Sequence, residues 1–320
     1  MGRYILRRLM WLIPVVILVA FTIFTILYFV PGDPTSQMLG PNPTQAQREE
    51  LRAELGLDDS YFVQLGRFFK ETFLEFNLGT SYQYKTQVSA DLMQRLPITF
   101  QFAALTFLLE ALIGIPLGVT AAVHQNSLVD RCCTVVAVIG ASLPSFWFAL
   151  MLVIVFAVNL DILPAFGITT WTGWILPVAA NCIMDLGSIA RQTRSQMLEV
   201  IRSDYIVTAR ARGLSEQTIR YCHALPNALI PVVTTLGTRF GRALGGTVII
   251  ESVFSIPGVG LYINDAINAR DYPVIRGSVV VLALLLCIIV LLTDLLYAYI
   301  DPRIKAQYER QGKRRAKKHG

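Results

Sequence analysis

Charged side chains are scarce in this sequence. Of its 320 residues, 16% are Asp, Glu, Lys or Arg, whereas 54% are apolar. In a typical soluble domain about a quarter of the residues are charged. The composition therefore argues against a soluble enzyme of one or two domains.

Cysteine and histidine are also few, and their positions exclude two kinds of site. The five cysteines provide neither a disulfide framework nor a CxxC metal spacing. The three histidines all fall in segments that should face the cytoplasm, which leaves no intramembrane histidine cluster for a metal. We expect no metal site and no cofactor.

Two signatures of catalysis are absent as well. The sequence has no GxxxxGK[ST] phosphate loop, so it has no Walker A loop with which to hold ATP. No nucleophile is accompanied by a base and an orienting group. We therefore expect no catalytic residue, and any energy from ATP must come from a partner.

What the sequence does contain is long apolar runs. A helix rises about 1.5 Å per residue, so about 20 apolar residues cross a hydrocarbon layer about 30 Å thick. Six such runs occur, at 9–30, 99–123, 134–160, 174–197, 228–250 and 274–300. They predict an all-α, polytopic membrane protein with six transmembrane helices.

The runs divide the chain into four segments. Residues 1–30 form an N-terminal transmembrane helix that is too long for a cleaved signal peptide. Residues 31–98 carry nine acidic and six basic side chains, with helical spacing at 45–57 and 61–76, and predict a small extracytoplasmic helical cap. Residues 99–300 hold the other five helices, and 301–320 form a basic cytoplasmic tail.

The basic residues predict the orientation. Eighteen Lys and Arg lie in segments 1–8, 124–131, 191–226 and 301–320, whereas the short loops on the other side hold very few. Basic loops stay on the cytoplasmic side, so both termini should be cytoplasmic. This distribution also accounts for the net charge of +6 without nucleic acid, and membrane lipid is the expected surrounding.

One inner segment, 204–226, has the sequence DYIVTARARGLSEQTIRYCHALP and is too polar to cross a membrane. Good helix formers precede Gly213, a fitting helix stop, and Ser215 can cap a second helix. The pattern predicts two helices joined by a glycine turn on the inner face. The alternative is a basic, solvated loop.

The spacing of Ala209, Gly213, Leu225 and Pro226 resembles the EAA motif of ABC importer permeases, whose cytoplasmic helices dock into the ATPase subunits. The segment departs from that motif at Val207, Thr208 and His223. The resemblance implies ATPase-coupling residues, which would be Ala209, Arg210, Gly213, Leu225 and Pro226.

Further motifs extend the resemblance to nearly the whole chain. They are the Arg-rich start, PGDP at 31–34, LGLD at 55–58, SLPSFW at 142–147, Glu251 with Phe254 and PGVG at 257–260, RDYP at 270–273 and DPR at 301–303. Together they resemble the B-type permease subunit of the dipeptide, oligopeptide and nickel importers. The resemblance implies a type I, MetI-like permease core.

The same resemblance implies partners and a mechanism. The chain would form half of a translocation pathway with a second, homologous permease, and would work with two ABC ATPase subunits and an extracytoplasmic substrate-binding protein in a bacterial inner membrane. Alternating access would carry di- or oligopeptides across. Nickel, a nickel chelate or a glutathione-like peptide remains an alternative substrate.

Two other classes remain as rivals. A stand-alone channel or secondary transporter would work without ATPases, but the two halves show no internal repeat and segment 204–226 would have no role. A membrane-embedded enzyme would need a catalytic constellation. Activity of the purified chain alone would support either rival.

The fifth apolar run combines small and charged residues. Gly237, Gly241 and Gly245 recur every four residues, which favours close helix packing. Arg239 and Arg242 lie one turn apart on another face, where facing lipid would cost about 2.5–3.5 kcal/mol each.

Two carboxylates could form ion pairs with these arginines. They are Glu110 in the second run and Asp185 in the fourth. All four charged residues are candidates for the translocation path. The alternative is that they form internal ion pairs that hold the bundle together.

Overall fold

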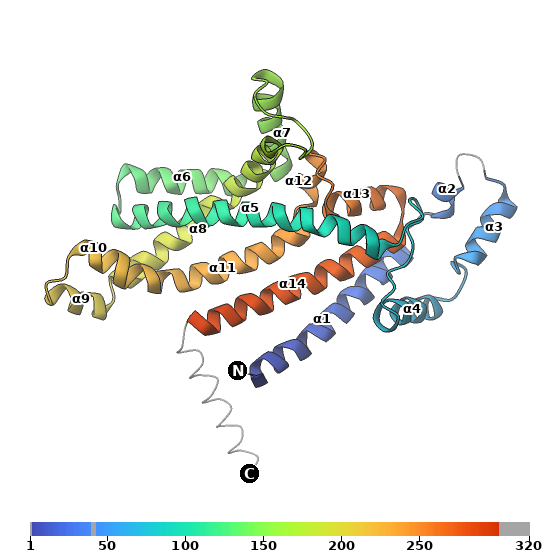
Figure 1. Ribbon diagram of the computed structural model, residues 1–320, viewed down its shortest axis with the longest axis horizontal. Helices are drawn as coiled ribbons and strands as arrows, with labels where there is room; N and C mark the ends of the chain where they lie inside the picture. The colour runs from blue at the N-terminus through green and yellow to red at the C-terminus, as the bar shows by residue number, and fades with distance from the viewer. Residues whose placement is uncertain (1, 40–42, 301–320) are drawn as a thin grey trace, which may run out of the picture. The chain divides into compact units, whose positions relative to one another are not determined.

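The computed structural model describes residues 2–39 and 43–300, and these residues are helical almost throughout (Figure 1). No β-strand is assigned among them, and one isolated bridge joins Thr80 to Gln87. The all-α class predicted from the sequence is confirmed. The basic tail predicted at 301–320 lies outside the described residues.

The helices follow one another with short connections. In chain order they are α1 (Gly2–Phe29), α2 (Thr35–Met38), α3 (Gln45–Glu54), α4 (Tyr61–Phe69), η1 (Lys70–Leu74), α5 (Val88–Val123), α6 (Leu128–Ser142), α7 (Ser145–Leu152), η2 (Val153–Asn159), η3 (Trp171–Trp174), α8 (Ile175–Ile201), α9 (Asp204–Ala211), α10 (Glu216–Thr218), η4 (Ile219–Ala224), α11 (Leu225–Gly246), α12 (Val248–Val253), α13 (Val259–Ala269) and α14 (Tyr272–Ile300).

Three of these helices are long and apolar enough to cross a membrane, over Leu9–Phe29, Val88–Val123 and Tyr272–Thr293. Two bent pairs raise the number to five if each pair is one span. One pair is α6 with α7, bent by 105° near Pro144, and the other is a bend of 47° within α8. The fifth predicted span, 228–250, corresponds to α11, which does not meet the same measure within the described chain, so the count of six remains a prediction.

By its internal contacts the chain divides into two compact units. Among the described residues, unit 1 comprises 2–8, 102–243 and 288–300, and unit 2 comprises 9–39, 43–101 and 244–287. The four segments predicted from the sequence concern membrane topology, which compactness does not test.

In unit 2, polar helices follow α1. Thr44 caps α3, because its hydroxyl accepts a hydrogen bond from the Gln47 backbone N–H while the Gln47 side chain accepts one from Thr44 N–H. Helix α3 has no buried residue, whereas α4 packs on α1 and α14 through Phe68, Phe24 and Val280. The helical spacing predicted at 45–57 and 61–76 is therefore confirmed by α3, α4 and η1.

A buried carboxylate organises the other part of unit 2. Glu251 is fully buried. It accepts hydrogen bonds from the hydroxyls of Thr99 at 3.0 Å and Thr247 at 2.8 Å. It also accepts from the backbone N–H groups of Gly260 at 2.7 Å and Leu261 at 3.1 Å, in the first turn of α13. Glu251 thus joins α12, α13 and the part of α5 in unit 2 through one side chain.

Unit 1 is a set of long helices packed at close range. The carboxylate of Asp130 on α6 accepts two hydrogen bonds from Arg194 on α8, at 2.5 and 2.8 Å. A Cβ on Gly187 of α8 would overlap the backbone of Ala137 on α6, so these two helices approach as closely as a glycine allows. The rigid packing of α8 matters because α8 carries part of the candidate site.

Candidate coupling surface and intramembrane charge cluster

Residues 204–224 form a helical knob at one end of unit 1, which we call the coupling knob. Helix α9 ends at Ala211, and the N–H of Gly213 donates to the carbonyl of Arg210 at 2.9 Å. Gly213 has a φ of +81°, a conformation that glycine adopts without strain. The hydroxyl of Ser215 then accepts from Thr218 N–H and caps α10. The predicted pair of helices around a glycine turn is confirmed.

The coupling knob is anchored by an apolar core. Ile206 and Ile219 are fully buried and Ala209 is 9% exposed. They pack in one cluster with Val119 at the end of α5 and Met197 on α8. Leu225 packs against this cluster at the start of α11, next to Pro226, which is exposed. The knob is thus a packed part of unit 1, and the alternative of a solvated loop is wrong.

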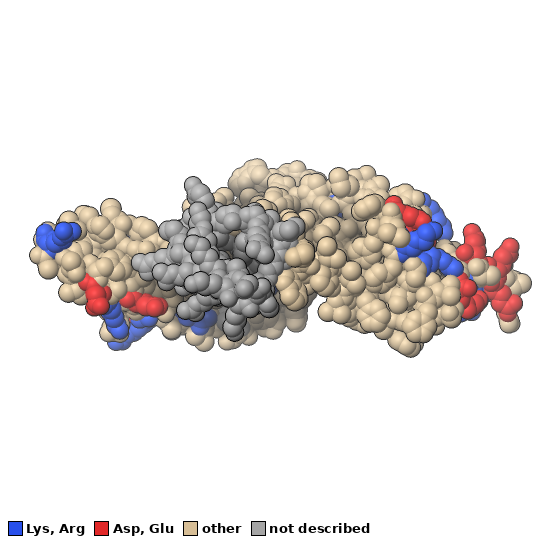
Figure 2. Space-filling model, turned by 90° about the horizontal axis from the view of Figure 1, so that it is seen from below, with Lys and Arg blue, Asp and Glu red and all other residues tan. Residues whose placement is uncertain are grey.

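The outer surface of the knob is both apolar and charged. Tyr205, Val207, Leu214 and Tyr221 are 40–57% exposed. On the face seen in Figure 2, charged side chains of unit 1 gather at the end that carries α9 and α10. An exposed cluster of this kind is typical of a surface that meets another protein.

One ion pair stiffens that surface. The guanidinium of Arg210 donates to Glu216 at 2.7 and 3.3 Å across the Gly213 turn. This hydrogen bonding lowers the pKa of the Glu216 carboxyl. Both groups are exposed, and exposed pairs contribute little to stability. The effect of the pair is therefore to fix the shape of the turn.

Inside the helical body, the structure brings two of the predicted charges together. The guanidinium of Arg239 on α11 forms a salt bridge with Asp185 on α8, and also donates to the Ser188 hydroxyl at 2.8 Å. Side-chain exposure is 12% for Arg239 and 47% for Asp185. The pair therefore joins two helices while its carboxylate remains accessible.

The other two predicted charges lie nearby without a direct ion pair among the described residues. Glu110 on α5 is 4% exposed, and it lies within electrostatic range of Asp185, Arg239 and Arg242. Arg242 is exposed. The charge cluster thus consists of one formed pair and two further charges from α5 and α11.

The sequence reading missed two polar members of this region. Ser188 binds Arg239, and the amide of Gln192 on α8 donates to the Thr235 hydroxyl on α11 at 2.7 Å. Asp185, Ser188 and Gln192 are spaced three and four residues apart, which places them on one face of α8. This spacing could have identified the polar face of α8 from the sequence.

The predicted glycine stripe is confirmed at one position. A Cβ on Gly237 of α11 would overlap the side chain of Thr293 on α14, so the helices touch there. A Cβ on Gly245 would meet nothing within 4 Å. The stripe therefore makes a local contact rather than a continuous seam in the described chain.

Over the described residues, no group of three or more His, Cys, Asp or Glu is placed to hold a metal ion. The candidate site therefore comprises the coupling knob and the charge cluster.

Two known protein families match successive parts of the chain. Residues 114–306 match the family described as "Binding-protein-dependent transport system inner membrane component". Residues 1–103 match the N-terminal region described for the same membrane components. The family match therefore covers most of the chain.

Curated relatives cover almost the whole length. A dipeptide transport system permease protein, DppB, of Alkalihalophilus pseudofirmus is 39% identical over 95% of this chain and 100% of its own. The oligopeptide transport system permease protein AppB of Bacillus subtilis is 37% identical over 95% and 100%. The glutathione transport system permease protein GsiC of Salmonella paratyphi A is 37% identical over 95% and 99%.

A solved structure supports the fold. A chain of the MetNI methionine ABC transporter in inward-facing conformations superposes with a TM-score of 0.53 at 16% identity, covering 66% of this chain and 96% of that chain. With its apolar helices and its matches along most of its length, this chain belongs to the family of binding-protein-dependent transport system inner membrane components.

Proposed function

We propose that this chain is the permease subunit of an ABC importer for short peptides and forms half of its translocation pathway. The observation that carries the proposal is the coupling knob, which is packed into unit 1 by buried residues and yet exposes Tyr205, Val207, Leu214 and Tyr221. A rigid helical knob with an exposed apolar face suits docking into an ATPase subunit. A stand-alone channel has no use for such a surface.

The proposed assembly contains two ABC ATPase subunits, a second homologous permease and an extracytoplasmic substrate-binding protein. ATP-driven closure of the ATPases would move the knob, and α8 and α11 would transmit the movement because they are packed on it through Met197 and Ala228. We further propose that the chain lies in a bacterial inner membrane with both termini in the cytoplasm, an orientation that the basic inner segments support.

Short peptides are the proposed cargo. The relatives described above are named as dipeptide, oligopeptide and glutathione permeases, and these names favour a peptide over nickel or a nickel chelate. A peptide carboxylate is an anion that the exposed Arg242 could bind along the path. We assign Arg239 and Asp185 to holding α8 on α11, and Arg242 and Glu110 to lining the path.

The test is made on the assembled importer, reconstituted with its partner subunits. Gly213→Val should abolish most of the ATP hydrolysis that a dipeptide-loaded binding protein stimulates, because a β-branched residue is strained at φ +81°. A Cβ there meets nothing within 4 Å, so the effect comes from the backbone alone. Uptake of labelled dialanine should fall with it.

The matched control is Gly213→Asn. Asparagine tolerates positive φ, so this variant should retain most of the stimulated ATPase activity and uptake. Both variants should reach the membrane in equal amounts. A Gly213→Val importer that behaves like the parent would remove the coupling role, and uptake of a nickel chelate in preference to dialanine would overturn the peptide assignment.

A further inference from the structure

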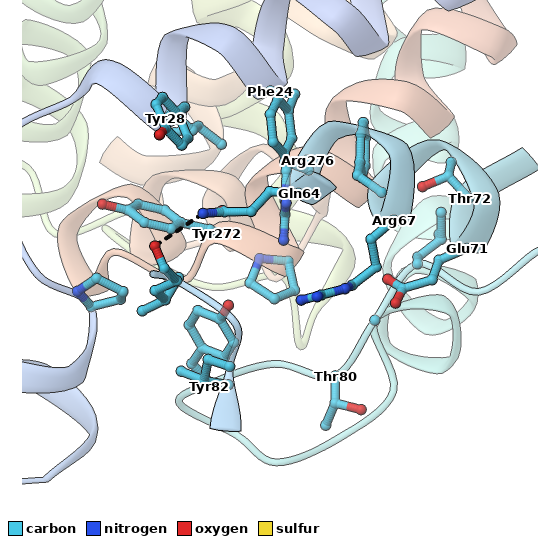
Figure 3. Close-up of a pocket in the computed structure, with 18 of the residues that line it drawn as sticks. Phe24, Tyr28, Gln64, Arg67, Glu71, Thr72, Thr80, Tyr82, Tyr272 and Arg276 are labelled. Atoms are coloured by element: carbon cyan, nitrogen blue, oxygen red, sulfur yellow. Dashed lines mark hydrogen bonds between the residues drawn. The ribbon is translucent and has the colours of Figure 1, made fainter. Parts of the chain in front are cut away.

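A polar cavity of about 520 Å³ lies within unit 2 (Figure 3). It is lined by residues at the end of α1, by α4 and η1, and by the first turn of α14. The apolar span of α1 ends at Phe29, and that of α14 begins at Tyr272. Because two spans end around it, the cavity lies at the depth of lipid headgroups.

Arg276 brings a cation into this cavity. Its guanidinium carbon lies 5.7 Å from the ring centroid of Phe24 and 5.1 Å from that of Phe68. Its Nε is buried and has no hydrogen-bond partner in the described chain, and the same holds for the hydroxyl of Tyr272. Buried donors are normally satisfied. These two donors therefore need an acceptor that the described residues do not supply.

The other arginines of the lining are already neutralised. Arg52 pairs with Asp58 at 2.7 Å, and Arg67 pairs with Asp59 at 2.5 Å. No such pair is recorded for Arg276 over residues 2–39 and 43–300. Among the three lining arginines, Arg276 is thus the one whose charge is open to a ligand.

Glu71 brings the opposite charge to the same cavity, from η1. The adjacent Lys70 pairs with Glu75 instead, at 3.0 Å. Glu71 and Arg276 interact electrostatically, but no ion pair joins them in the described structure. Figure 3 shows Arg276 near the middle of the lining residues and Glu71 on the side formed by η1. The cavity thus presents one cation and one anion, set apart, to a single ligand.

Large apolar side chains within two residues of the lining are exposed to an extent that suits lipid and not water. Phe29 is 72% exposed, Phe62 80%, Leu74 75% and Phe76 83%. These side chains belong to the end of α1 and to the helices and turn around α4 and η1. Tyr28 and Tyr82 in the lining add the aromatic side chains that are enriched at membrane interfaces. Large exposed apolar residues beside a headgroup-depth cavity indicate contact with acyl chains.

We propose that this cavity binds the phosphoethanolamine headgroup of a membrane phospholipid. The phosphate accepts hydrogen bonds from Arg276 and the Tyr272 hydroxyl, and the ammonium group binds the Glu71 carboxylate. Guanidinium–phosphate contacts are charge-assisted and strong. A dipeptide carries the same two charges, but it has no acyl chains to cover the exposed apolar side chains near the lining. The lipid therefore fits the site and its surroundings together.

The test uses the full chain purified in detergent and two short-chain lipids with identical acyl chains, a phosphatidylethanolamine and a phosphatidylglycerol. Binding is measured by native mass spectrometry and by the rise in Tm. We expect phosphatidylethanolamine to bind about tenfold more tightly or better, because a charged hydrogen bond to Glu71 is available to it alone.

Two variants separate the two charges. Glu71→Gln should remove the preference for phosphatidylethanolamine, so that both lipids bind with similar affinity. Arg276→Gln should weaken the binding of both lipids about tenfold or more. The matched controls are Glu54→Gln and Arg48→Gln, two exposed residues of α3, and these should bind like the parent.

Three results would overturn the proposal. One is equal binding of the two lipids by the parent chain, a comparison that requires no variant to fold. Another is unchanged lipid binding by Arg276→Gln, or by Tyr272→Phe together with Arg276→Lys if the first variant is not recovered. The third is a rise in Tm with dialanine that Arg276→Gln abolishes, which would make the cavity a peptide site.

Discussion

At the scale of single residues, the charges inside the helices differ in their partners and in their exposure. The sequence predicted that Arg239 and Arg242 need partners, and it offered Glu110 and Asp185 equally. The structure pairs Arg239 with Asp185. That choice depends on how α8 lies against α11, and the packing of two helices cannot be derived from the charge of either one. Arg242 is exposed, so its surroundings differ from those of Arg239.

This difference leads to opposite expectations for two similar substitutions. Arg239→Gln should lower the free energy of unfolding by roughly 1–3 kcal/mol, less than the 3–5 kcal/mol for a fully buried pair because Asp185 is 47% exposed. Arg242→Gln should leave the amount of assembled importer unchanged and reduce dipeptide uptake. Thermal unfolding in detergent and uptake in membrane vesicles measure the two effects.

A second substitution distinguishes the roles of the pair. If Arg239 holds α8 to α11, Asp185→Asn should restore stability to the Arg239→Gln variant, since no unpaired carboxylate remains. If the double variant regains stability but does not take up dipeptide, Arg239 itself is needed for transport. That result would place Arg239 in the path and contradict our assignment.

At the scale of elements, local signals predicted the coupling knob and missed the region after α11. Gly213 and Ser215 act within a few residues, and both the turn and the cap are found where the sequence indicated them. The sequence predicts a short outer loop between the apolar runs 228–250 and 274–300, but this stretch contains the second half of α12 and all of α13. The first turn of α13 is satisfied by Glu251, nine or ten residues earlier in the chain. Because the capping residue is so far from α13 in the chain, no local sequence pattern predicts this cap.

The knob also differs from its expected form in one respect. Its second helix runs through the π-helical η4 directly into α11, with Leu225 N–H donating to the carbonyl of Arg220. Pro226 follows at once and has no N–H to donate, which disfavours the ordinary helical hydrogen-bond pattern at this point. The knob and the helix that carries Arg239 are therefore one continuous rod. This continuity supports the proposed transmission of movement.

Helix packing at the glycine stripe gives a prediction at the same scale. Gly237→Leu should lower the free energy of unfolding by about 1–3 kcal/mol, because the new side chain must displace Thr293 on α14. Gly245→Leu is the matched control, since a Cβ there meets nothing within 4 Å. Thermal unfolding of the purified chain measures both. Equal destabilisation by the two substitutions would show that α11 and α14 do not touch at Gly237.

At the scale of the whole molecule, hydropathy predicted the membrane class and did not fix the number of spans. Within residues 2–39 and 43–300, three helices have the required length and apolarity, and two bent pairs bring the number to five if each pair is one span. The charged residues that make α11 a candidate for the path also lower its mean hydropathy. The same arginines therefore make α11 harder to recognise as a membrane span. The orientation rests on Lys and Arg in the inner segments, which are read from composition alone.

The orientation can be tested with two identical substitutions. Gln45→Cys lies at the exposed start of α3 in the predicted outer cap, and Gln217→Cys lies on the exposed surface of the coupling knob. The exposed native Cys132 and Cys222 are first replaced by Ser to remove background labelling. In intact cells, a membrane-impermeant maleimide should label Gln45→Cys and leave Gln217→Cys unlabelled, and after cell lysis it should label both. Labelling of Gln217→Cys in intact cells would place the knob outside, where no ATPase could reach it, and would contradict both the topology and the coupling role.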